Sequence, residues 1–351
     1  MVILGKTAAH VKMLVTSAKF KPAFGGIPTV VDLLASEYAR AGHDVTVLTV
    51  TPGSREDGGS YRVVESARAV DAMRLIRWCD VLVQNGPALR TAWPLFILNR
   101  PWIIIHHSLA YRIPWAKLFA SRHAHHISVS RAMADLLPFP TAIIPNPYDD
   151  RVFCVDRDVR ADNDLIFVGR LSSEKGVDVL LRALSLLHEG GDRITLTIVG
   201  DGPKAAELKH LGGALGVLAS VRFVGRREPA EIARLLRCHR VAVAPSRFET
   251  FGVAVLEALA CGCAVVGSRS GGIPEALGEC GELAAPGDPV ALASAIRRAL
   301  TSGRSADSPS EQVRRHLEAH TPAAIAAMHL RLISTVVERR NRNTAAVDRK
   351  I

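Results

Sequence analysis

The sequence contains few aromatic residues and no long uninterrupted hydrophobic run. Phe, Trp and Tyr make up 5% of the 351 residues, and the basic residues are spread along the chain. Both features argue against nucleic-acid binding, which needs clustered cations with interleaved aromatics. The longest apolar stretch, VAVLEALACGCAVVG, is interrupted before the roughly 20 residues of a membrane span, and MVILGKTAAH lacks a signal-peptide hydrophobic segment. We therefore expect a cytoplasmic protein without a transmembrane anchor.

The sequence also lacks a CxxC pair, although it contains six cysteines. A zinc site or a thiol-exchange site usually needs such a pair. Three histidines in RHAHHIS (His123, His125 and His126) have no carboxylate or cysteine at ligand spacing. We therefore predict reduced, buried thiols, no metal site and no cofactor.

The net charge is positive, at +10. Such a charge favours anionic partners, which include nucleic acid, anionic lipid and phosphorylated small molecules, and charge alone does not choose among them. Residues 1–155 carry 17 Lys/Arg against 11 Asp/Glu, and the end of the chain, ERRNRNTAAVDRK, is also basic. Peripheral contact with the anionic inner face of a membrane and a simple solvated basic surface both fit this pattern.

Both halves of the chain alternate short Val/Ile/Leu-rich runs with helical stretches of about 10 to 15 residues. This pattern predicts an α/β protein with two doubly wound parallel sheets, each covered on both faces. A segment rich in Pro, Asp and Asn separates the halves. We expect an N-terminal domain over 1–148, a linker over 149–164, a second domain over 165–320, a helix over 321–340 that returns to the first domain, and a basic tail over 341–351.

Ligands of doubly wound sheets bind at the carboxyl ends of the strands, where several chemically distinctive turns fall. Gly25 and Gly26 precede a helix and let the backbone approach a phosphate or a sugar, although a packing role is equally consistent with them. Arg170 ends a strand and Lys175 follows five residues later. Two cations at that place suit a diphosphate, and without the other turns they would be read as surface charges. The VGDGP turn lacks the third glycine of a dinucleotide fingerprint.

The stretch RFETFGVAVLEALACG carries two carboxylates, Glu249 and Glu257, on either side of a predicted helix start. The helical rise between positions 251 and 257 is roughly 9 Å, which is too far for a glycosidase-like carboxylate pair. We therefore expect the two acids to contact different parts of one extended ligand. Ribose hydroxyls would supply donors to Glu257, and the alternative is a buried Glu257 paired with an arginine. The amides of Thr250, Phe251 and Gly252 suit phosphate oxygens.

These motifs together resemble glycosyltransferase family 4, the retaining enzymes with the GT-B fold. The resemblance covers residues 11 to about 340 and rests on FGGIPTVVDLLASEYARAGHDVTVLT, FVGRLSSEKGVDVLLRAL, LTIVGDGP, VRFVGR and APSRFETFGVAVLEALACGCAVVGSRSGGIPE. About nine residues precede the family's usual start, and the short N-terminal half leaves the acceptor undefined. The resemblance implies transfer of a sugar, with retention and without a metal, from a nucleotide-diphosphate sugar with UDP or GDP as the nucleotide.

The resemblance also implies roles for single residues. Glu249 would face the sugar hydroxyls, Glu257 would bind the ribose, and His106 would lie near the reacting face of the sugar, with His107 as the alternative. The donor would also be held by Gly25, Gly26, Gly169, Arg170 and Lys175, with Gly225 and Arg226 near the base.

Two other functions remain open beside a transferase. One is a nucleotide-sugar epimerase or hydrolase, for which the sequence shows no suitable acid and base. The other is a non-catalytic binding partner, which would not need to keep Arg170, Lys175, Glu249 and Glu257 together. The acceptor is expected to be a glycan, a lipid-linked molecule or a small molecule, and the sequence does not indicate the oligomeric state.

Overall fold

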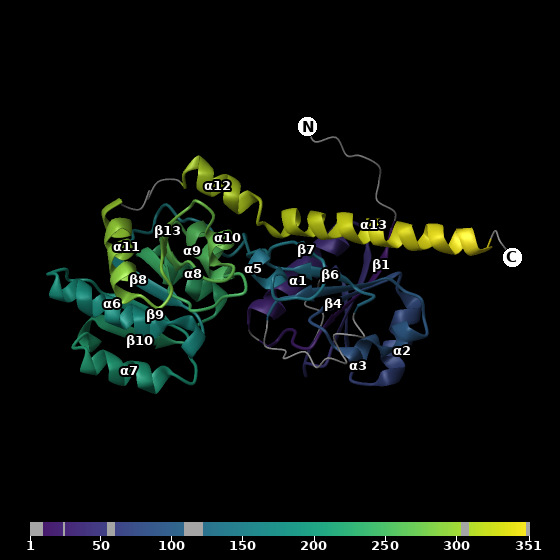
Figure 1. Ribbon diagram of the computed structural model, residues 1–351, viewed down its shortest axis with the longest axis horizontal. Coiled ribbons are helices and arrows are strands. Elements are labelled where there is room, and N and C mark those ends of the chain that lie inside the picture. The colour runs from purple at the N-terminus through teal and green to yellow at the C-terminus, as the bar shows by residue number, and fades with distance from the viewer. Residues whose placement is uncertain (1–9, 24, 55–59, 109–121, 303–308, 349–351) are drawn as a thin grey trace. The chain divides into compact units, whose positions relative to one another are not determined.

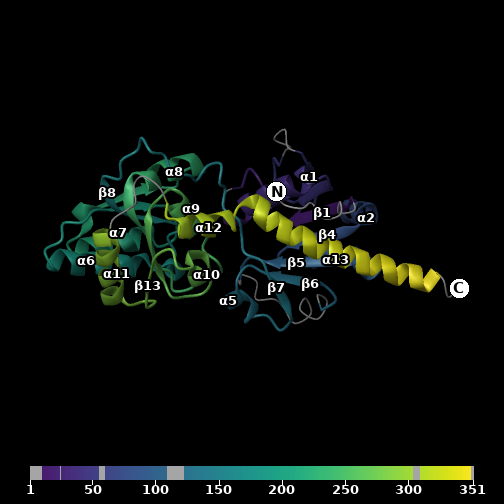
Figure 2. The ribbon, with the colours of Figure 1, turned by 90° about the horizontal axis from the view of Figure 1, so that it is seen from above.

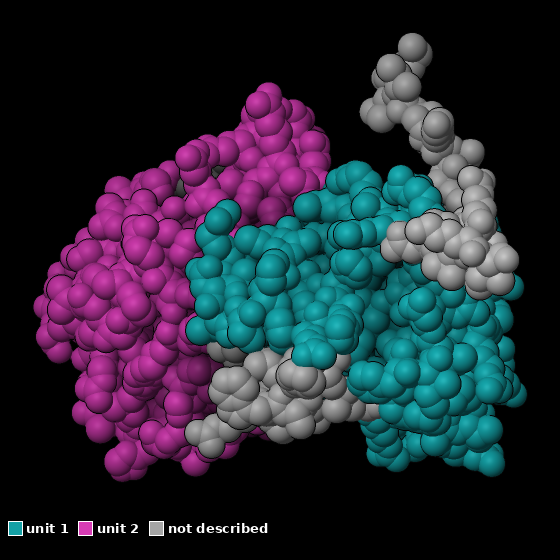
Figure 3. All heavy atoms as spheres, turned by 45° about the vertical axis from the view of Figure 1, so that its right-hand side comes forward, with its two compact units in different colours: residues 1–147, 322–351 teal, residues 148–321 magenta. Residues whose placement is uncertain are grey.

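The computed structural model describes residues 10–23, 25–54, 60–108, 122–302 and 309–348. The chain forms two compact units, coloured separately in Figure 3. Unit 1 comprises residues 1–147 and 322–351, and unit 2 comprises residues 148–321. The amino-terminal extension noted in the sequence lies outside the described residues.

Unit 1 is built on a parallel sheet whose strands follow the buried apolar runs of the first half of the chain (Figure 1). The order of its seven described strands places β1 beside both β2 and β4, which is the doubly wound arrangement. Strands buried on both faces explain why the runs are continuously apolar rather than alternating. In sheet order the strands are β3 (Arg62–Glu65), β2 (Asp44–Thr49), β1 (Lys12–Ser17), β4 (Val81–Asn85), β5 (Trp102–His106), β6 (His125–Ser128) and β7 (Thr141–Ile143).

The helices of unit 1 connect these strands and present apolar side chains to the core. Helix α1, for example, buries Val30, Val31, Leu34 and Tyr38. The described helical elements of this unit are α1 (Gly26–Arg40), α2 (Ala69–Trp78), α3 (Leu89–Ala92), the 3-10 helix η1 (Trp93–Phe96), α5 (Arg131–Ala134) and α13 (Pro322–Asp348).

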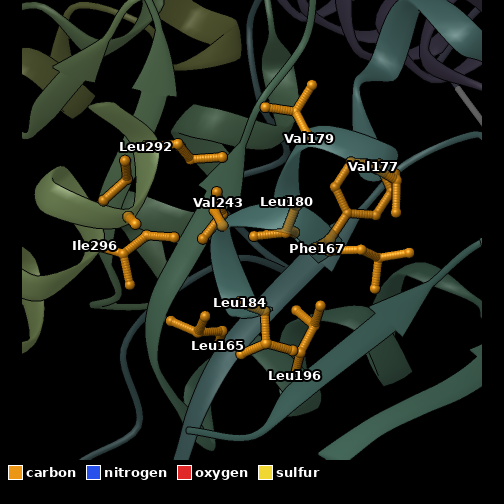
Figure 4. Packing of buried hydrophobic residues seen from close by; sticks show 14 of the residues in the cluster. Leu165, Phe167, Val177, Val179, Leu180, Leu184, Leu196, Val243, Leu292 and Ile296 are labelled. Carbon is orange, nitrogen blue, oxygen red and sulfur yellow. The ribbon is translucent and has the colours of Figure 1, made fainter. Parts of the chain in front are cut away.

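Unit 2 has a second parallel sheet, with six described strands. Its largest core cluster joins β8 to α6 and α11 through Phe167, Leu180, Leu184 and Ile296, as Figure 4 shows. In sheet order the strands are β10 (Val221–Gly225), β9 (Leu196–Val199), β8 (Asn163–Val168), β11 (His239–Ala244), β12 (Ala264–Ser268) and β13 (Glu282–Ala284); the helical elements are η2 (Ser173–Lys175), α6 (Val177–Glu189), α7 (Ala205–Ala214), η3 (Leu218–Ser220), α8 (Pro229–Arg237), α9 (Val253–Ala260), α10 (Ile273–Leu277), α11 (Pro289–Ser302) and α12 (Glu311–Glu318).

The predicted fold, two doubly wound parallel sheets, is therefore confirmed. Each sheet has one point where the strand order reverses. In unit 1 it lies between β1 and β4, and in unit 2 between β8 and β11. Ligands of such sheets bind beside the carboxyl ends of the two strands at the reversal.

The end of the chain departs from the prediction of a basic tail over 341–351. Helix α13 continues to Asp348, because the segment NRNTAAVD contains no Pro or Gly and includes the helix-forming pair Ala345 and Ala346. Both views in Figures 1 and 2 show α13 lying along unit 1. No helix within the described ranges is both long enough and apolar enough to cross a membrane.

The thiols are less uniformly buried than the sequence suggested. All six cysteines are free, and Cys79, Cys261 and Cys263 are buried. Cys154 is exposed; it lies near the start of unit 2, where the Arg237 guanidinium contacts its sulfur at 3.4 Å.

A buried hydrogen bond fastens α13 to α1. The Tyr38 hydroxyl lies 2.6 Å from Nδ1 of His329, and both side chains are almost fully buried. Burial, together with the charge of His107, lowers the pKa of His329 to about 3. His329 is thus neutral in the folded protein at pH 7, as a buried imidazole with one hydrogen bond should be.

This histidine should make unit 1 sensitive to acid. An unfolded histidine has a pKa near 6.5, so between about pH 6.5 and 3 the unfolded chain binds a proton that the folded one excludes. The contribution of neutral His329 to the free energy of unfolding is fully present above about pH 6.5 and falls by about 1.4 kcal/mol per pH unit below that pH. Urea unfolding of the wild type and His329→Gln at pH 7.5 and pH 5 should show a smaller loss in the variant. Equal losses in both proteins would contradict the buried, neutral His329.

Candidate functional site

The turns at the carboxyl edge of the unit 2 sheet are in direct backbone contact with one another. Gly200 has a φ of +133°, and a Cβ at this position would lie 1.9 Å from the carbonyl oxygen of Gly169. The amide of Leu171 donates to the carbonyl of Asp201 at 3.0 Å, and the amide of Lys204 donates to that of Leu171. The glycines of the VGDGP turn are therefore explained by close packing against the loop that carries Arg170.

The reversal point of unit 2 brings two of the predicted residues together. Lys175 ends η2 in the loop after β8, Glu249 lies in the turn after β11, and the Lys175 ammonium pairs with the Glu249 carboxylate. Their side chains are 24% and 20% exposed, so both remain accessible. Gly176 makes this approach feasible, since its φ is +67° and a Cβ there would meet the carbonyl oxygen of Pro245 at 2.0 Å.

The turn that carries Glu249 is held rigidly on both sides. Arg247 makes a two-pronged ion pair with Asp178 of α6, at 2.7 and 2.6 Å, and its amide donates to the carbonyl of Glu174 at 2.8 Å. On the other side, the Gly272 amide donates to the carbonyl of Glu249 at 2.8 Å. A Cβ on Gly271 would lie 1.9 Å from the same oxygen. A carboxylate held by such a frame is preorganised for a ligand.

Glu257 lies in the second turn of α9, in a different place from Glu249. It is half-buried, and no cation or hydrogen-bond donor contacts its carboxylate among the residues that the structure describes. The alternative of a Glu257–arginine pair is therefore not observed. Burial, and to a smaller extent the negative charge of Asp149, raises the pKa of Glu257 to about 7. A carboxylate left without a partner at this cost suits a ligand that brings its own donors.

Because burying the unpartnered Glu257 carboxylate costs free energy, removing its charge should stabilise the folded protein. The pKa of Glu257 in the folded protein lies above its unfolded value near 4.5. The contribution of Glu257 to the free energy of unfolding is therefore complete below about pH 4.5 and is lost as the pH rises through 7. At pH 8, Glu257→Gln should be about 2–3 kcal/mol more stable than the wild type in urea unfolding, with little difference at pH 5. Glu249→Gln, which leaves Lys175 without its partner, is the matched control and should show no such gain. A destabilised Glu257→Gln would mean that the carboxylate has a partner in the folded protein.

The remaining predicted donor residues of unit 2 lie at the same edge of the sheet. Arg170 follows β8 and is exposed, and Gly225 ends β10 with a φ of +70°. Arg226 comes next and is exposed. Thr250, Phe251 and Gly252 lead into α9, whose first amides have no acceptor within the helix. Phe251 is buried and stacks on His320, with ring centroids 6.0 Å apart, which fixes the start of α9.

In unit 1, the two predicted glycines lie at the reversal point between β1 and β4. Gly25 is the residue before α1 and has a φ of +148°, and Gly26 is the first residue of that helix. A Cβ on Gly26 would meet no atom within 4 Å, so packing does not require glycine there. The absence of a packing reason at Gly26 favours the role of ligand approach over that of tight packing.

The two adjacent histidines of unit 1 have different surroundings. His106 is the last residue of β5, and its Nε2 lies 2.9 Å from Nδ1 of His126, whose ring stacks on Phe139. Burial, with the charges of His126 and His107, lowers the pKa of His106 to about 3. The Arg122 guanidinium donates to Nε2 of His123 at 3.1 Å, and the described residues contain no group of three or more potential metal ligands.

His107 lies just beyond the strand, between two carboxamides. Its Nε2 is 2.8 Å from Oδ1 of Asn85, and its Nδ1 is 3.1 Å from Oδ1 of Asn146. Nδ2 of Asn85 donates to the carbonyl of Thr16 at 3.2 Å, which orients that amide so that its oxygen faces His107. A neutral imidazole carries one ring proton, so it can donate to only one of these two oxygens. Burial lowers the pKa of His107 to about 4, so the ring is neutral.

Some residues that shape the site were not recognised from the sequence. Arg247, Asp178 and Gly271 fix the Glu249 turn, and Asn85 and Asn146 fix His107. The paired glycines in SGGIPE were the one available signal, because they resemble Gly25 and Gly26 in preceding a helix.

Comparisons with known proteins find similarity to glycosyltransferases. Residues 162–302 match the family model described as glycosyl transferases group 1. The glycogen synthase of Mycobacterium tuberculosis (strain CDC 1551 / Oshkosh) is 28% identical, over 87% of this chain and 90% of that protein. The GDP-mannose-dependent alpha-(1-6)-phosphatidylinositol dimannoside mannosyltransferase of M. tuberculosis (strain ATCC 25177 / H37Ra) is 27% identical, over 79% of this chain and 84% of that protein.

Solved structures show the same fold. HepE from Anabaena, in complex with UDP-glucose, has a TM-score of 0.79 at 21% identity and covers 93% of this chain and 100% of its own. The matches support a glycosyltransferase with the GT-B fold. The residues matched by the family model include Arg170, Lys175, Glu249 and Glu257, so the donor residues proposed from the sequence lie within the matched domain.

Proposed function

We propose that this protein is a retaining glycosyltransferase of family 4, which transfers a sugar from a nucleotide-diphosphate sugar to an acceptor hydroxyl without a metal. The observation that carries the proposal is the Lys175–Glu249 pair at the reversal point of unit 2. A cation for phosphate and a carboxylate for hydroxyls are joined there in one rigid frame. The unpartnered Glu257 lies on the adjacent helix α9, and the amino-terminal end of such a helix suits an anion.

The division of roles follows from these positions. Arg170, Lys175 and the first amides of α9 would hold the diphosphate and stabilise the charge that builds on it as it leaves. Glu249 would accept hydrogen bonds from sugar hydroxyls through the oxygen that Lys175 leaves open. Glu257 would accept those of the ribose hydroxyls, with the base near Gly225 and Arg226.

Unit 1 would contribute Gly25, Gly26 and a histidine. Of the two histidines, we favour His107, because it lies at the carboxyl edge where such sheets bind ligands, whereas the His106 ring turns to His126. His107→Gln should then reduce turnover more than His106→Gln.

For the chemical step we propose displacement on one face of the sugar. The acceptor oxygen forms a bond to the anomeric carbon as the bond from that carbon to the phosphate oxygen breaks. The departing phosphate oxygen takes the proton of the acceptor hydroxyl, so the products are the glycoside and the nucleoside diphosphate. This step needs no enzyme nucleophile and retains the anomeric configuration.

The donor nucleotide is proposed as UDP or GDP. HepE is described with UDP-glucose, and the mycobacterial mannosyltransferase is described as GDP-mannose-dependent. The acceptor is proposed as a glycan, a lipid-linked molecule or a small molecule.

The proposal is tested by incubating the protein with a panel of UDP- and GDP-sugars and candidate acceptors. Release of the nucleotide that depends on an acceptor, with a product of the donor's anomeric configuration by proton NMR, is the expected result. Release without an acceptor would indicate a hydrolase, and an altered sugar on an intact nucleotide would indicate an epimerase. A product of inverted configuration would overturn the retaining mechanism.

A further inference from the structure

Unit 1 exposes two large apolar side chains next to each other in the chain. Phe96, the last residue of η1, is 60% exposed, and Ile97 is 71% exposed. Their neighbours are anchored, since Pro94 is buried and Leu95 and Leu98 pack against the core cluster around Leu75 and Trp102. The segment is thus fixed to the unit, and exposure of the pair is not explained by a loose loop.

Arginines lie on the elements that adjoin this apolar pair. The Arg100 guanidinium donates to the carbonyl of Arg77, at the end of α2, at 2.9 Å, and α2 packs against η1. Arg74 lies one turn earlier on α2 and is exposed, and Arg90 lies on α3, which continues directly into η1. Helices α2 and α3, which both contact η1, therefore carry exposed arginines.

The charge of this region is not neutralised by its acids. Between positions 69 and 100 the acids are Asp71 and Asp80. Asp71 accepts from the Ser66 hydroxyl at 2.6 Å and lies 3.6 Å from the Arg74 guanidinium, and Asp80 accepts from the Lys12 amide. In the described part of the chain, no carboxylate pairs with Arg77, Arg90 or Arg100.

We propose that the surface formed by Arg74, Arg77, Arg90, Phe96, Ile97 and Arg100, the apolar–basic patch, docks unit 1 on an anionic lipid bilayer. A bilayer surface supplies phosphate oxygens to the arginines and an acyl boundary to the two apolar side chains, which no ordinary acidic protein surface offers together. The single aromatic ring is too little for the stacking that single-stranded nucleic acid requires. The proposed docking is peripheral, and none of the described helices is long and apolar enough to cross the bilayer.

Vesicle flotation of the full chain tests the proposal. The wild type should bind vesicles of equimolar phosphatidylcholine and phosphatidylglycerol, should bind phosphatidylcholine vesicles at least about tenfold less, and should be released by salt. Phe96→Ser/Ile97→Ser should lower partitioning about tenfold or more. Arg77→Gln/Arg100→Gln should lower it about 25-fold, at roughly fivefold for each arginine near the surface.

Matched controls lie in unit 2. Leu218→Ser/Val290→Ser removes two exposed apolar residues, and Arg182→Gln/Arg193→Gln removes two exposed arginines. These variants should bind vesicles as the wild type does, and thermal unfolding should show that all variants are folded. Donor binding and transfer to a water-soluble acceptor should be unchanged in the patch variants, so failure here is separate from failure of the proposed function.

Three results would overturn the proposal. These are the absence of wild-type binding to anionic vesicles, equal binding by the patch variants and the controls, and equal binding to neutral vesicles. Loss of self-association in Phe96→Ser/Ile97→Ser by size-exclusion chromatography, without vesicle binding by the wild type, would assign the patch to a second copy of the chain instead.

Discussion

Glu249→Ala is expected to lower kcat about 10²- to 10³-fold while changing the Kd of the nucleotide sugar by less than about fivefold. The rigid frame of Arg247 and Gly271 holds this carboxylate in one place, and contacts that strengthen as the sugar changes shape act on turnover. Steady-state kinetics and calorimetric donor binding on the same variant measure the two effects separately.

The neighbouring acid Glu174 provides the control for that result. Its carboxylate is hydrogen bonded to Ser172 in the adjacent loop and has no proposed contact with the sugar. Glu174→Ala should keep kcat within about threefold of the wild type. In contrast, Glu257→Ala should chiefly weaken donor binding. If Glu249→Ala and Glu257→Ala lowered kcat and affinity equally, the proposed division between sugar and ribose would be wrong.

Lys175→Met is expected to lower kcat/KM about 10²- to 10³-fold and to weaken nucleoside diphosphate binding about 10- to 100-fold. A charge-assisted hydrogen bond to phosphate contributes about 1.5 to 3 kcal/mol, and the leaving diphosphate gains charge in the transition state. Affinity for the nucleoside without phosphates should hardly change. Comparing the Kd values of the nucleoside and of its diphosphate in wild type and variant isolates the phosphate contribution.

Two further variants serve as controls for the Lys175→Met prediction. Lys209→Met removes a lysine of unit 2 that lies over the Phe223 ring, away from the proposed phosphate contacts, and should bind the diphosphate as the wild type does. Lys175→Arg keeps the charge and should restore part of the affinity. An unchanged preference for the diphosphate in Lys175→Met would show that this ammonium serves only its pair with Glu249.

The sequence predicted the fold because buried parallel strands leave continuous apolar runs, as in the segments that became β1, β8 and β11. It did not predict strand order, since hydrogen bonding between strands distant in sequence leaves no local pattern. The end of α13 differs from the prediction, because arginines near position 340 are typical of a helix end although nothing after them breaks a helix.

The site was predicted in its residue types and only partly in its contacts. The separation of Glu249 from Glu257 followed from helical rise, and the structure places one in a turn and the other in α9. The Lys175–Glu249 pair was not foreseen, because it joins loops 74 residues apart. The absence of a cation beside Glu257 could not be predicted either, because it depends on which side chains pack around α9. The carboxamides that flank His107 could not be predicted for the same reason, since they come from other parts of the chain.

The most direct test of the account is thermal unfolding of the wild type with a panel of UDP- and GDP-sugars. A ligand present at about 100 times its Kd stabilises the folded protein by about 2.7 kcal/mol. At least one nucleotide sugar should therefore raise the Tm by several degrees, and the shift should be much reduced in both Lys175→Met and Glu257→Ala. A Tm that no nucleotide sugar raises would contradict the proposed donor site, and with it the proposed function.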